Sequence, residues 1–431
     1  MTNETSGTAG APLQGVVVLD LTQIYNGPYA TFLMAMAGAD VVKIEPPDGE
    51  HLRRRPNSGG TTEPFAVLNA NKRSLVLDLK TDVGRQVLLE LVRKADVLVE
   101  NYAPGVMARL NLGADTLHQT NPRLVIASGN GYGAEGAYRD FTAMDLTVQA
   151  MSGVLSVTGH PDQEPVKAGP AIADFFGGIH LYGAIVTALY KRQQTGEGSC
   201  VEVAMMDALI PSLMSNLGLH NSREQQNLRT GNSHGGLLVV PYNVYPVQDG
   251  GVAILAVSDQ HWLALGDVLE YPDLVTDPRF VDKSSRVKNR AALDARIGEL
   301  TIKFTKQMLF DRLVAARVPS APVRSLDEVI NDEHLHARGM LKWTEHPVYG
   351  RMLAMGSPLR FSDYAIDYLA ENGYDPQFGA RPLKRLIQKE IINQLSKRIL
   401  AGDIDKTKPV LVDVFDGMVV FRNEAISTAT V

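Results

Sequence analysis

Short runs of β-branched and aliphatic residues, separated by helical stretches, constrain the fold of this chain more than any other feature. Gly27-Pro28 follows the first run and opens a helix that ends near Gly38, and the second run comes directly after it. A strand, a helix and another strand in this order imply parallel strands with a right-handed crossover. We therefore predict an α/β fold, a doubly wound parallel sheet, with these strands: Val16–Asp20, Val41–Glu45, Leu75–Leu79, Asp96–Glu100, Leu124–Ser128 and Cys200–Met205.

In such a sheet, ligands bind beyond the carboxyl ends of the strands. Here those ends are Thr22–Asn26, Pro46–Arg55, Asn101–Gly105 and Gly129–Gly133. Residues 131–136 match the G-x-G-x-x-G pattern of dinucleotide sites, but no helix opens within the motif and no acid-ended strand follows it. The sequence therefore argues against an NAD site.

Composition excludes several classes of function. The 431 residues carry a net charge of −6, so no basic field points to nucleic acid or an anionic membrane. Cys200 is the single cysteine, which excludes an internal disulfide and a cysteine metal cluster, and we expect it to be a small buried residue and no metal to be bound. No run of about 18 apolar residues occurs, so we expect no membrane span and a cytoplasmic protein. Residues 1–12 lack the features of a signal peptide and are expected to be a disordered tail.

The character of the chain divides it into further parts. Residues 13–223 form the predicted large domain, and residues 224–339 a smaller α+β domain that contains a β-hairpin, three helices and a capping box at Ser325. Residues 340–362 alternate like strands and are expected to return to the large domain. A small α/β appendage is expected from residue 363 to residue 431.

Asp174 is the acid that the sequence singles out. It lies in the apolar, glycine-rich stretch 167–178, at or just before the start of a helical run. Apolar neighbours raise the pKa of a carboxyl group, whereas a helix N-terminus lowers it, and the sequence leaves that balance open. The simplest alternative is that Asp174 is a plain N-cap.

Residues 13–361 resemble the family III CoA-transferases, which include formyl-CoA transferase, carnitine CoA-transferase and the 2-methylacyl-CoA racemases. The resemblance lies in these motifs: Val18–Thr22 with Gly27-Pro28, Gly38–Glu45, Asn71–Ser74 with Leu77–Lys80, Val99–Gly105, Ser152-Gly153, Ala173–Gly178 and Thr195–Gly198. It implies an enzyme that uses acyl-CoA and a small carboxylic acid as substrates and forms an interlocked homodimer. Residues 13–223 then become a CoA-binding domain.

The family's nucleophilic aspartate matches Asp174. The resemblance implies that its carboxylate attacks the donor thioester to give a mixed anhydride, and that CoA thiolate then forms an aspartyl-CoA thioester. Backbone donors for the intermediates are expected near Gly177 and Gly178. Gly235 and Gly236 resemble the glycine loop that covers the intermediate.

The same resemblance supplies candidate CoA contacts. Lys80, Asn101, Tyr102 and Arg109 match positions that hold the nucleotide end, while Tyr25 and Asn26 match the segment near the pantetheine and thioester. A basic residue of some relatives is Pro46 here, and Arg53, Arg54 or Arg55 is expected to replace it, with Arg54 as our choice.

Met144 and Asp145 are also expected beside the coenzyme. The racemase branch has a histidine where this chain has Met144, and methionine cannot move a proton. Transfer is therefore favoured, with 2-methylacyl-CoA racemase as the alternative.

Residues 363–423 resemble a different family, the C-terminal small domain of ClpB-type AAA+ disaggregases. Arg381 matches the sensor arginine of that domain, but the chain has no G-x-x-x-x-G-K-[ST] loop, so we expect no ATP hydrolysis. The resemblance implies a fusion, or a non-catalytic protein that assembles through this tail. It lies in three segments: Tyr364–Ala370, Gly373–Arg385 and Val410–Val414.

Overall fold

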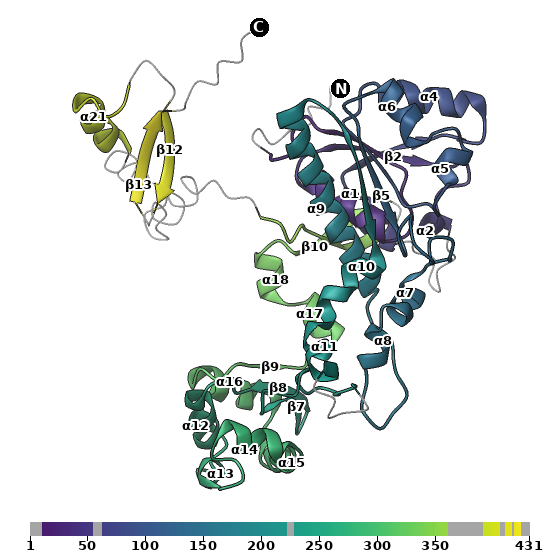
Figure 1. Cartoon of the computed structure of the whole chain (residues 1–431). Coiled ribbons are helices and arrows are strands. Elements are labelled where there is room, and N and C mark those ends of the chain that lie inside the picture. Colours follow the sequence, from purple (N-terminus) through teal and green to yellow (C-terminus); the bar gives the residue numbers. More distant parts are fainter. Residues whose placement is uncertain are drawn as a thin grey trace. The chain divides into compact units, whose positions relative to one another are not determined.

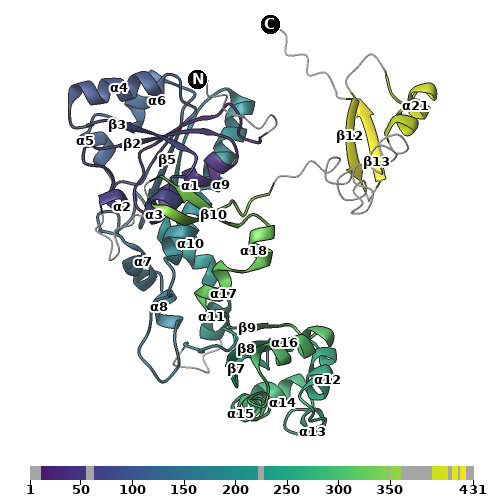
Figure 2. The same ribbon diagram turned by 180° about the vertical axis from the view of Figure 1, so that it is seen from behind.

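The computed structural model consists of two compact units, Met1–Ser357 and Pro358–Val431. The structure describes residues 11–54, 63–221, 228–347, 349–360, 391–405, 410–415 and 418–423. Figures 1 and 2 present the chain from opposite sides.

A six-stranded parallel sheet forms the centre of the first unit, in the order β3-β2-β1-β4-β5-β6. The sequence order of the strands reverses between β1 and β4, so a crevice opens beyond the carboxyl ends of these two strands. This confirms the predicted doubly wound α/β fold. The strands are β1 (Val17–Asp20), β2 (Asp40–Glu45), β3 (Lys72–Val76), β4 (Val97–Glu100), β5 (Val125–Asn130) and β6 (Ser199–Ala204).

Helices cover both faces of this sheet (Figure 1). α1 (Asn26–Met36) and α9 (Ile172–Thr195) pack together on one face, where Leu181 and Ile185 are fully buried against β5 and its neighbours. α4 (Asp82–Val92) and α6 (Ala114–Thr120) supply the apolar cluster on the other face. Among the described helices, only α9 is long and apolar enough to cross a membrane, but its buried side chains make it a core helix.

Two expectations about the sheet were wrong. The third strand spans Lys72–Val76 and not Leu75–Leu79, because Leu77 and Leu79 pack into the apolar core after the strand has ended. Cys200 is exposed and not buried, because β6 is the edge strand of the sheet and its side chains alternate in exposure.

The predicted small α+β elements are present in the first unit. Hairpin β7–β8 carries a short third strand, and hairpin β10–β11 occupies the segment predicted to alternate like strands. Ser325 and Glu328 form the predicted capping box. The strands are β7 (Tyr242–Val247), β8 (Gly250–Leu255), β9 (Ser320–Pro322), β10 (Leu341–His346) and β11 (Gly350–Met355).

The remaining helices of this unit fall into two groups. Those that accompany the parallel sheet are α2 (His51–Arg54), α3 (Glu63–Leu68), α5 (Val106–Arg109), α7 (Asp145–Met151), α8 (Val154–Val157), α10 (Met205–Leu209), the 3₁₀ helix η1 (Ile210–Leu213) and α11 (Met214–Asn221). Those of the later segment are α12 (Asp259–Val268), α13 (Asp273–Thr276), α14 (Lys283–Lys288), α15 (Arg290–Thr301), α16 (Lys306–Ala315), α17 (Leu326–Ile330) and α18 (Glu333–Ala337).

In the second unit, the described residues form helix α21 (Asn393–Leu400) and an antiparallel pair, β12 (Val410–Phe415) and β13 (Met418–Asn423). β12 coincides with the strand predicted at Val410–Val414. The predicted tail motifs 364–370 and 373–385, with Arg381, lie outside the described residues.

Candidate active site

Asp174 is the third residue of α9, so it lies inside the first turn of the helix. The N-cap is Ala171, which corrects the alternative that Asp174 is a plain cap. The Asp174 side chain belongs to a residue that is only 9% exposed. An acid in this position faces the electropositive end of a helix while apolar packing surrounds it.

At Asp174 the effects that raise the carboxyl pKa outweigh those that lower it. Burial raises the pKa of Asp174, the nearby Asp145 carboxylate raises it further, and a hydrogen bond from the Asn26 backbone N–H partly opposes both. The resulting pKa is about 7. The carboxyl group is therefore a far stronger base than an ordinary aspartate, and both of its protonation states are populated at neutral pH.

Asp145 is held in place from two sides. Its Oδ1 accepts a hydrogen bond from the Ala173 backbone N–H at 2.8 Å, and its Oδ2 accepts from Gln149 Nε2 at 2.7 Å. Gln149 is fully buried, and its Oε1 accepts from the Ala168 backbone N–H at 2.9 Å. Asp145 thus ties the start of α9 to α7 and fixes a negative charge beside Asp174.

A cavity of about 560 Å³ opens in front of Asp174. Loops that follow β1, β4 and β5 form its walls, as expected for the crevice between β1 and β4. We call it the Asp174 cavity. Of the predicted site residues, it brings together Asn26, Asn101, Tyr102, Arg109, Met144 and Asp174.

A second cavity of about 500 Å³, here the Lys80 cavity, lies beyond the ends of β1, β2 and β3. Lys80 and Arg54 line it, and Arg54 also pairs with Asp48. Tyr102 lines both cavities. A long ligand that passes Tyr102 could therefore occupy both.

The structure does not bring the predicted glycine loop to Asp174. Gly236 lines a third cavity of about 680 Å³ together with Lys288 and Arg290, and Gly235 lies against Ser215 and Asn216. Neither glycine lines the Asp174 cavity.

Gly177, Gly178 and Tyr25 have packing contacts. A Cβ atom at Gly177 would collide with the Asn26 side chain, and one at Gly178 would lie 2.6 Å from the Asn26 carbonyl oxygen. Both glycines lie within the hydrogen-bonded body of α9, where the N–H groups bond to carbonyls one turn earlier. This corrects the expectation that they supply oxyanion donors. Tyr25 stacks on Phe175 at a ring distance of 6.0 Å and lines neither cavity.

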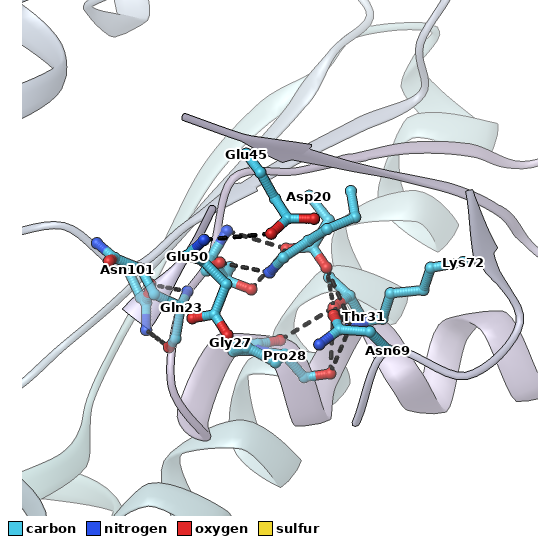
Figure 3. A network of polar contacts seen from close by, with 12 residues as sticks. Asp20, Gln23, Gly27, Pro28, Thr31, Glu45, Glu50, Asn69, Lys72 and Asn101 are labelled. Carbon is cyan, nitrogen blue, oxygen red and sulfur yellow. Dashed lines mark hydrogen bonds and ion pairs between the residues drawn. The ribbon is translucent and has the colours of Figure 1, made fainter. Parts of the chain in front are cut away.

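A buried ionic network that the sequence analysis missed lies behind the site (Figure 3). Asp20, at the end of β1, accepts hydrogen bonds from Thr22 at 2.5 Å, Thr31 at 2.7 Å and Lys72 at 2.9 Å. Lys43 lies 3.6 Å from Asp20 and donates to the Thr22 carbonyl oxygen. Burial would raise the pKa of Asp20, but the two lysines and the hydroxyl groups of Thr22 and Thr31 together outweigh it and hold the pKa far below its usual range.

The loop between β1 and α1 is anchored by this network and by Asn101. The Asn101 side chain exchanges two hydrogen bonds of 2.8 Å with the backbone of Gln23. Ile24, next in the loop, has φ of 66°, and its N–H donates to Glu50 at 3.2 Å (Figure 3 includes Gln23, Asn101 and Glu50). A β-branched residue in this conformation is strained, and its surroundings hold it there. The loop thereby fixes the start of α1 against Asp174.

Comparisons with known proteins agree with this geometry. A family model described as CoA-transferase family III matches residues 13–380. A succinyl-CoA:mesaconate CoA-transferase of Haloarcula marismortui is 38% identical over 81% of this chain and 90% of its own. An acetyl-CoA:oxalate CoA-transferase of Acetobacter aceti is 36% identical over 84% and 92%. A crystal structure of a CAIB/BAIF family protein from Brucella suis is 33% identical, with a TM-score of 0.72 over 82% of this chain and 93% of that one.

Nothing in these comparisons supports the expected ClpB-type small domain in the tail. The family match also runs to residue 380, past the boundary that was predicted near residue 362.

Proposed function

This chain belongs to CoA-transferase family III, an enzyme family that moves coenzyme A between carboxylic acids, and we propose that Asp174 is its nucleophile. The observation that carries the proposal is the placement of Asp174: a buried acid with a pKa of about 7 at the wall of a large cavity. Covalent catalysis by a carboxylate divides one difficult exchange into several easier steps.

The steps balance without any redox change. An Asp174 oxygen attacks the thioester carbonyl, the C–S bond breaks, and CoA leaves as the thiolate with a mixed anhydride on Asp174. The thiolate then attacks the aspartyl carbonyl, which breaks the anhydride C–O bond and releases the donor acid as a carboxylate. The acceptor carboxylate reacts with the aspartyl-CoA thioester by the same two steps in reverse.

The environment of Asp174 suits this role. A carboxylate attacks only in its ionised form, and its basicity rises with its pKa. Burial and Asp145 hold that pKa near neutrality, so an ionised fraction with raised basicity is available at neutral pH. The protonated form would be unreactive, so activity should rise with pH through about 7.

We assign the nucleotide end of CoA to the Lys80 cavity and the thioester to the Asp174 cavity. Lys80 and Arg54 are the cations among the described residues that line the Lys80 cavity, and they suit phosphate groups. Tyr102 borders both cavities and would accompany the pantetheine chain, with Asn101 beside it. Arg109 was expected at the nucleotide end, but it lines the Asp174 cavity with Met144, so we assign both to the wall near the thioester.

The acceptor is proposed to be a small dicarboxylic acid. Mesaconate and oxalate, which the names of two relatives give as acceptors, each carry two carboxylates. Arg139 lines the Asp174 cavity and pairs only loosely with its neighbour Asp140, at 3.4 Å. A guanidinium group at this position suits the carboxylate that does not react.

Racemisation finds less support. It needs a second proton-transfer group that reaches the substrate, and no histidine is among the described residues that line the cavity. Asp145 does not line the cavity either, and both of its oxygens accept hydrogen bonds from the protein. The residue at the expected position, Met144, carries no titratable group.

We also propose an interlocked homodimer. Exposed apolar side chains on α9 and α11, including Ile179, Tyr190 and Met214, would be covered by a second copy.

The domain limits 13–223, 224–339, 340–362 and 363–431 are retained as part of this proposal.

Intact-protein mass spectrometry tests the nucleophile. Wild type, Asp174→Ala and the control Asp207→Ala, an exposed acid on α10, are mixed with succinyl-, acetyl-, formyl- and oxalyl-CoA. We expect a covalent acyl or CoA adduct on wild type and on the control only. An adduct on folded Asp174→Ala, or none on folded wild type with any of the four donors, would contradict the proposal.

A further inference from the structure

Asn26 carries a buried amide that no described protein group satisfies. It is the first residue of α1, is 4% exposed, and lines the Asp174 cavity. Both Nδ2 and Oδ1 are buried and lack a hydrogen-bond partner among the described residues. The other buried atoms of this kind belong to His261, Trp262 and Arg286, on α12 and α14. An unpaired buried amide is destabilising, so a site that keeps one calls for a partner that arrives with the substrate.

Packing fixes the orientation of this amide. It lies between the end of β5 and α9: a Cβ atom at Gly129 would lie 2.5 Å from Asn26 Oδ1, and one at Gly177 would collide with Nδ2. Only glycine leaves space for the amide at these two positions. The backbone N–H of the same residue donates to Asp174. The Asn26 side chain is therefore held beside the nucleophile by contacts on both sides.

The reaction proposed above needs a hydrogen-bond donor at this place. Each step passes through a tetrahedral carbon whose oxygen becomes negatively charged, and a fixed donor in a buried site stabilises that charge strongly. Gly177 and Gly178 cannot supply it because their N–H groups lie within the body of α9. Asn26 lines the same cavity, and its buried side-chain N–H bonds have no partner among the described residues.

We infer that the Asn26 side-chain amide is the oxyanion donor of the transferase reaction. Its Nδ2–H donates a hydrogen bond to the oxygen of each tetrahedral intermediate formed at Asp174, and no proton leaves the amide. The inference rests on the proposed function, because it assumes covalent chemistry at Asp174. It assigns to Asn26 a role in the transition state rather than in holding CoA.

Three variants of Asn26 separate a donor from a packing role. Asn26→Ala and Asn26→Leu remove the donor, the first with a smaller side chain and the second with the same branched skeleton but larger volume, whereas Asn26→Ser keeps one. Thr301→Val is the matched control, because it removes a buried hydroxyl on α15 that donates to the Pro246 carbonyl, and Thr301 lines neither the Asp174 cavity nor the Lys80 cavity. For each protein we measure the rate of adduct formation with the acyl-CoA to which wild type responds fastest, kcat, and the Kd of free CoA.

We expect Asn26→Ala and Asn26→Leu to lower kcat and the adduct rate by about 10²–10³-fold. The Kd of free CoA should change by less than about threefold, Asn26→Ser should react at least about tenfold faster than Asn26→Leu, and Thr301→Val should keep kcat within about threefold. If one donorless variant fails to give a cooperative melt, the other replaces it.

Any of three results would overturn the inference: a wild-type adduct rate in a donorless variant, equal rates for the serine and leucine variants, or a loss confined to CoA affinity. These failures differ from failure of the proposed function, which would appear as the absence of adducts on wild type itself.

Discussion

Asp20 and Asp174 are two buried aspartates that contact the same helix but differ in their partners. Thr31 of α1 donates to Asp20, and the backbone N–H of Asn26 at the start of α1 donates to Asp174. Burial raises the pKa of both carboxyl groups. Lys43 and Lys72, with the hydroxyl groups of Thr22 and Thr31, reverse this effect at Asp20, whereas Asp145 reinforces it at Asp174.

The difference shows how one edge of a sheet can hold one carboxyl group charged and another near neutrality. Asp20 is permanently charged and fully hydrogen-bonded, so it fixes the loop that carries Ile24 and Asn26. Burial lowers the pKa of its partner Lys72 to about 8, and the charge of Asp20 opposes this shift. Asp174 has no cationic partner among the described residues, so its charge is available for chemistry. Burial alone does not distinguish the proposed nucleophile from Asp20, whereas the charges around each carboxyl group do.

The largest effect on stability is expected from breaking the Asp20 network. Asp20→Asn leaves two buried lysines without a counter-charge, and we expect the free energy of unfolding to fall by about 3–5 kcal/mol. Urea unfolding at neutral pH measures this. Asp48→Asn, which removes the exposed pair with Arg54, is the control and should cost less than about 1 kcal/mol. A loss of under about 1 kcal/mol in Asp20→Asn would refute the structural role.

At Asp174, in contrast, substitution by asparagine is expected to raise the free energy of unfolding. Its folded-state pKa is about 7 against an ordinary 3.8, so the folded protein favours the protonated acid, and stability falls as pH rises between these values. Asparagine resembles the protonated form. Asp174→Asn should therefore raise the free energy of unfolding at about pH 8 by roughly 1–4 kcal/mol, with a smaller gain at about pH 5.5.

Urea unfolding of wild type and Asp174→Asn at the two pH values is the measurement. The exposed Asp207→Asn serves as the control and should show no pH-dependent gain. Equal stability of Asp174→Asn and wild type at the higher pH would mean that Asp174 is not destabilised by burial.

The smallest effect is expected in the pH profile of activity, when the charge of Asp145 beside Asp174 is removed. The kcat/KM of wild type should rise with pH through about 7 as Asp174 ionises. Asp145→Asn removes the like charge and keeps an oxygen that can accept from the Ala173 N–H. The acidic limb of the profile should then move to lower pH, by up to about one unit, and Asp207→Asn should leave it in place. An unmoved limb would assign the raised pKa to burial alone.

The positions of most core elements could be predicted from local pattern, because β-branched runs and helix-opening residues act over a few neighbours. The third strand was misplaced for the converse reason. Its first residues, Lys72 and Arg73, do not resemble a strand. The Lys72 side chain is buried because it pairs with Asp20, which lies 52 positions earlier in the sequence. Cys200 was misjudged because no local pattern marks β6 as an edge strand.

The features of the candidate site also divide into those that local sequence predicts and those that it does not. The motifs identified Asp174 and the loops around it, and the carboxyl ends of the strands located the crevice. The sequence could not reveal the unpaired amide of Asn26 or the separation of Gly235 and Gly236 from Asp174 in this chain.

The sequence by itself determined the doubly wound fold, the family resemblance and the choice of Asp174 as the proposed nucleophile. Only the tertiary structure decided which buried carboxylate is held charged and which is held near neutrality. The physical reason is that a pKa depends on burial and on charges within a few ångströms, and these come from residues far apart in the chain: Lys43 and Lys72 for Asp20, and Asp145 for Asp174.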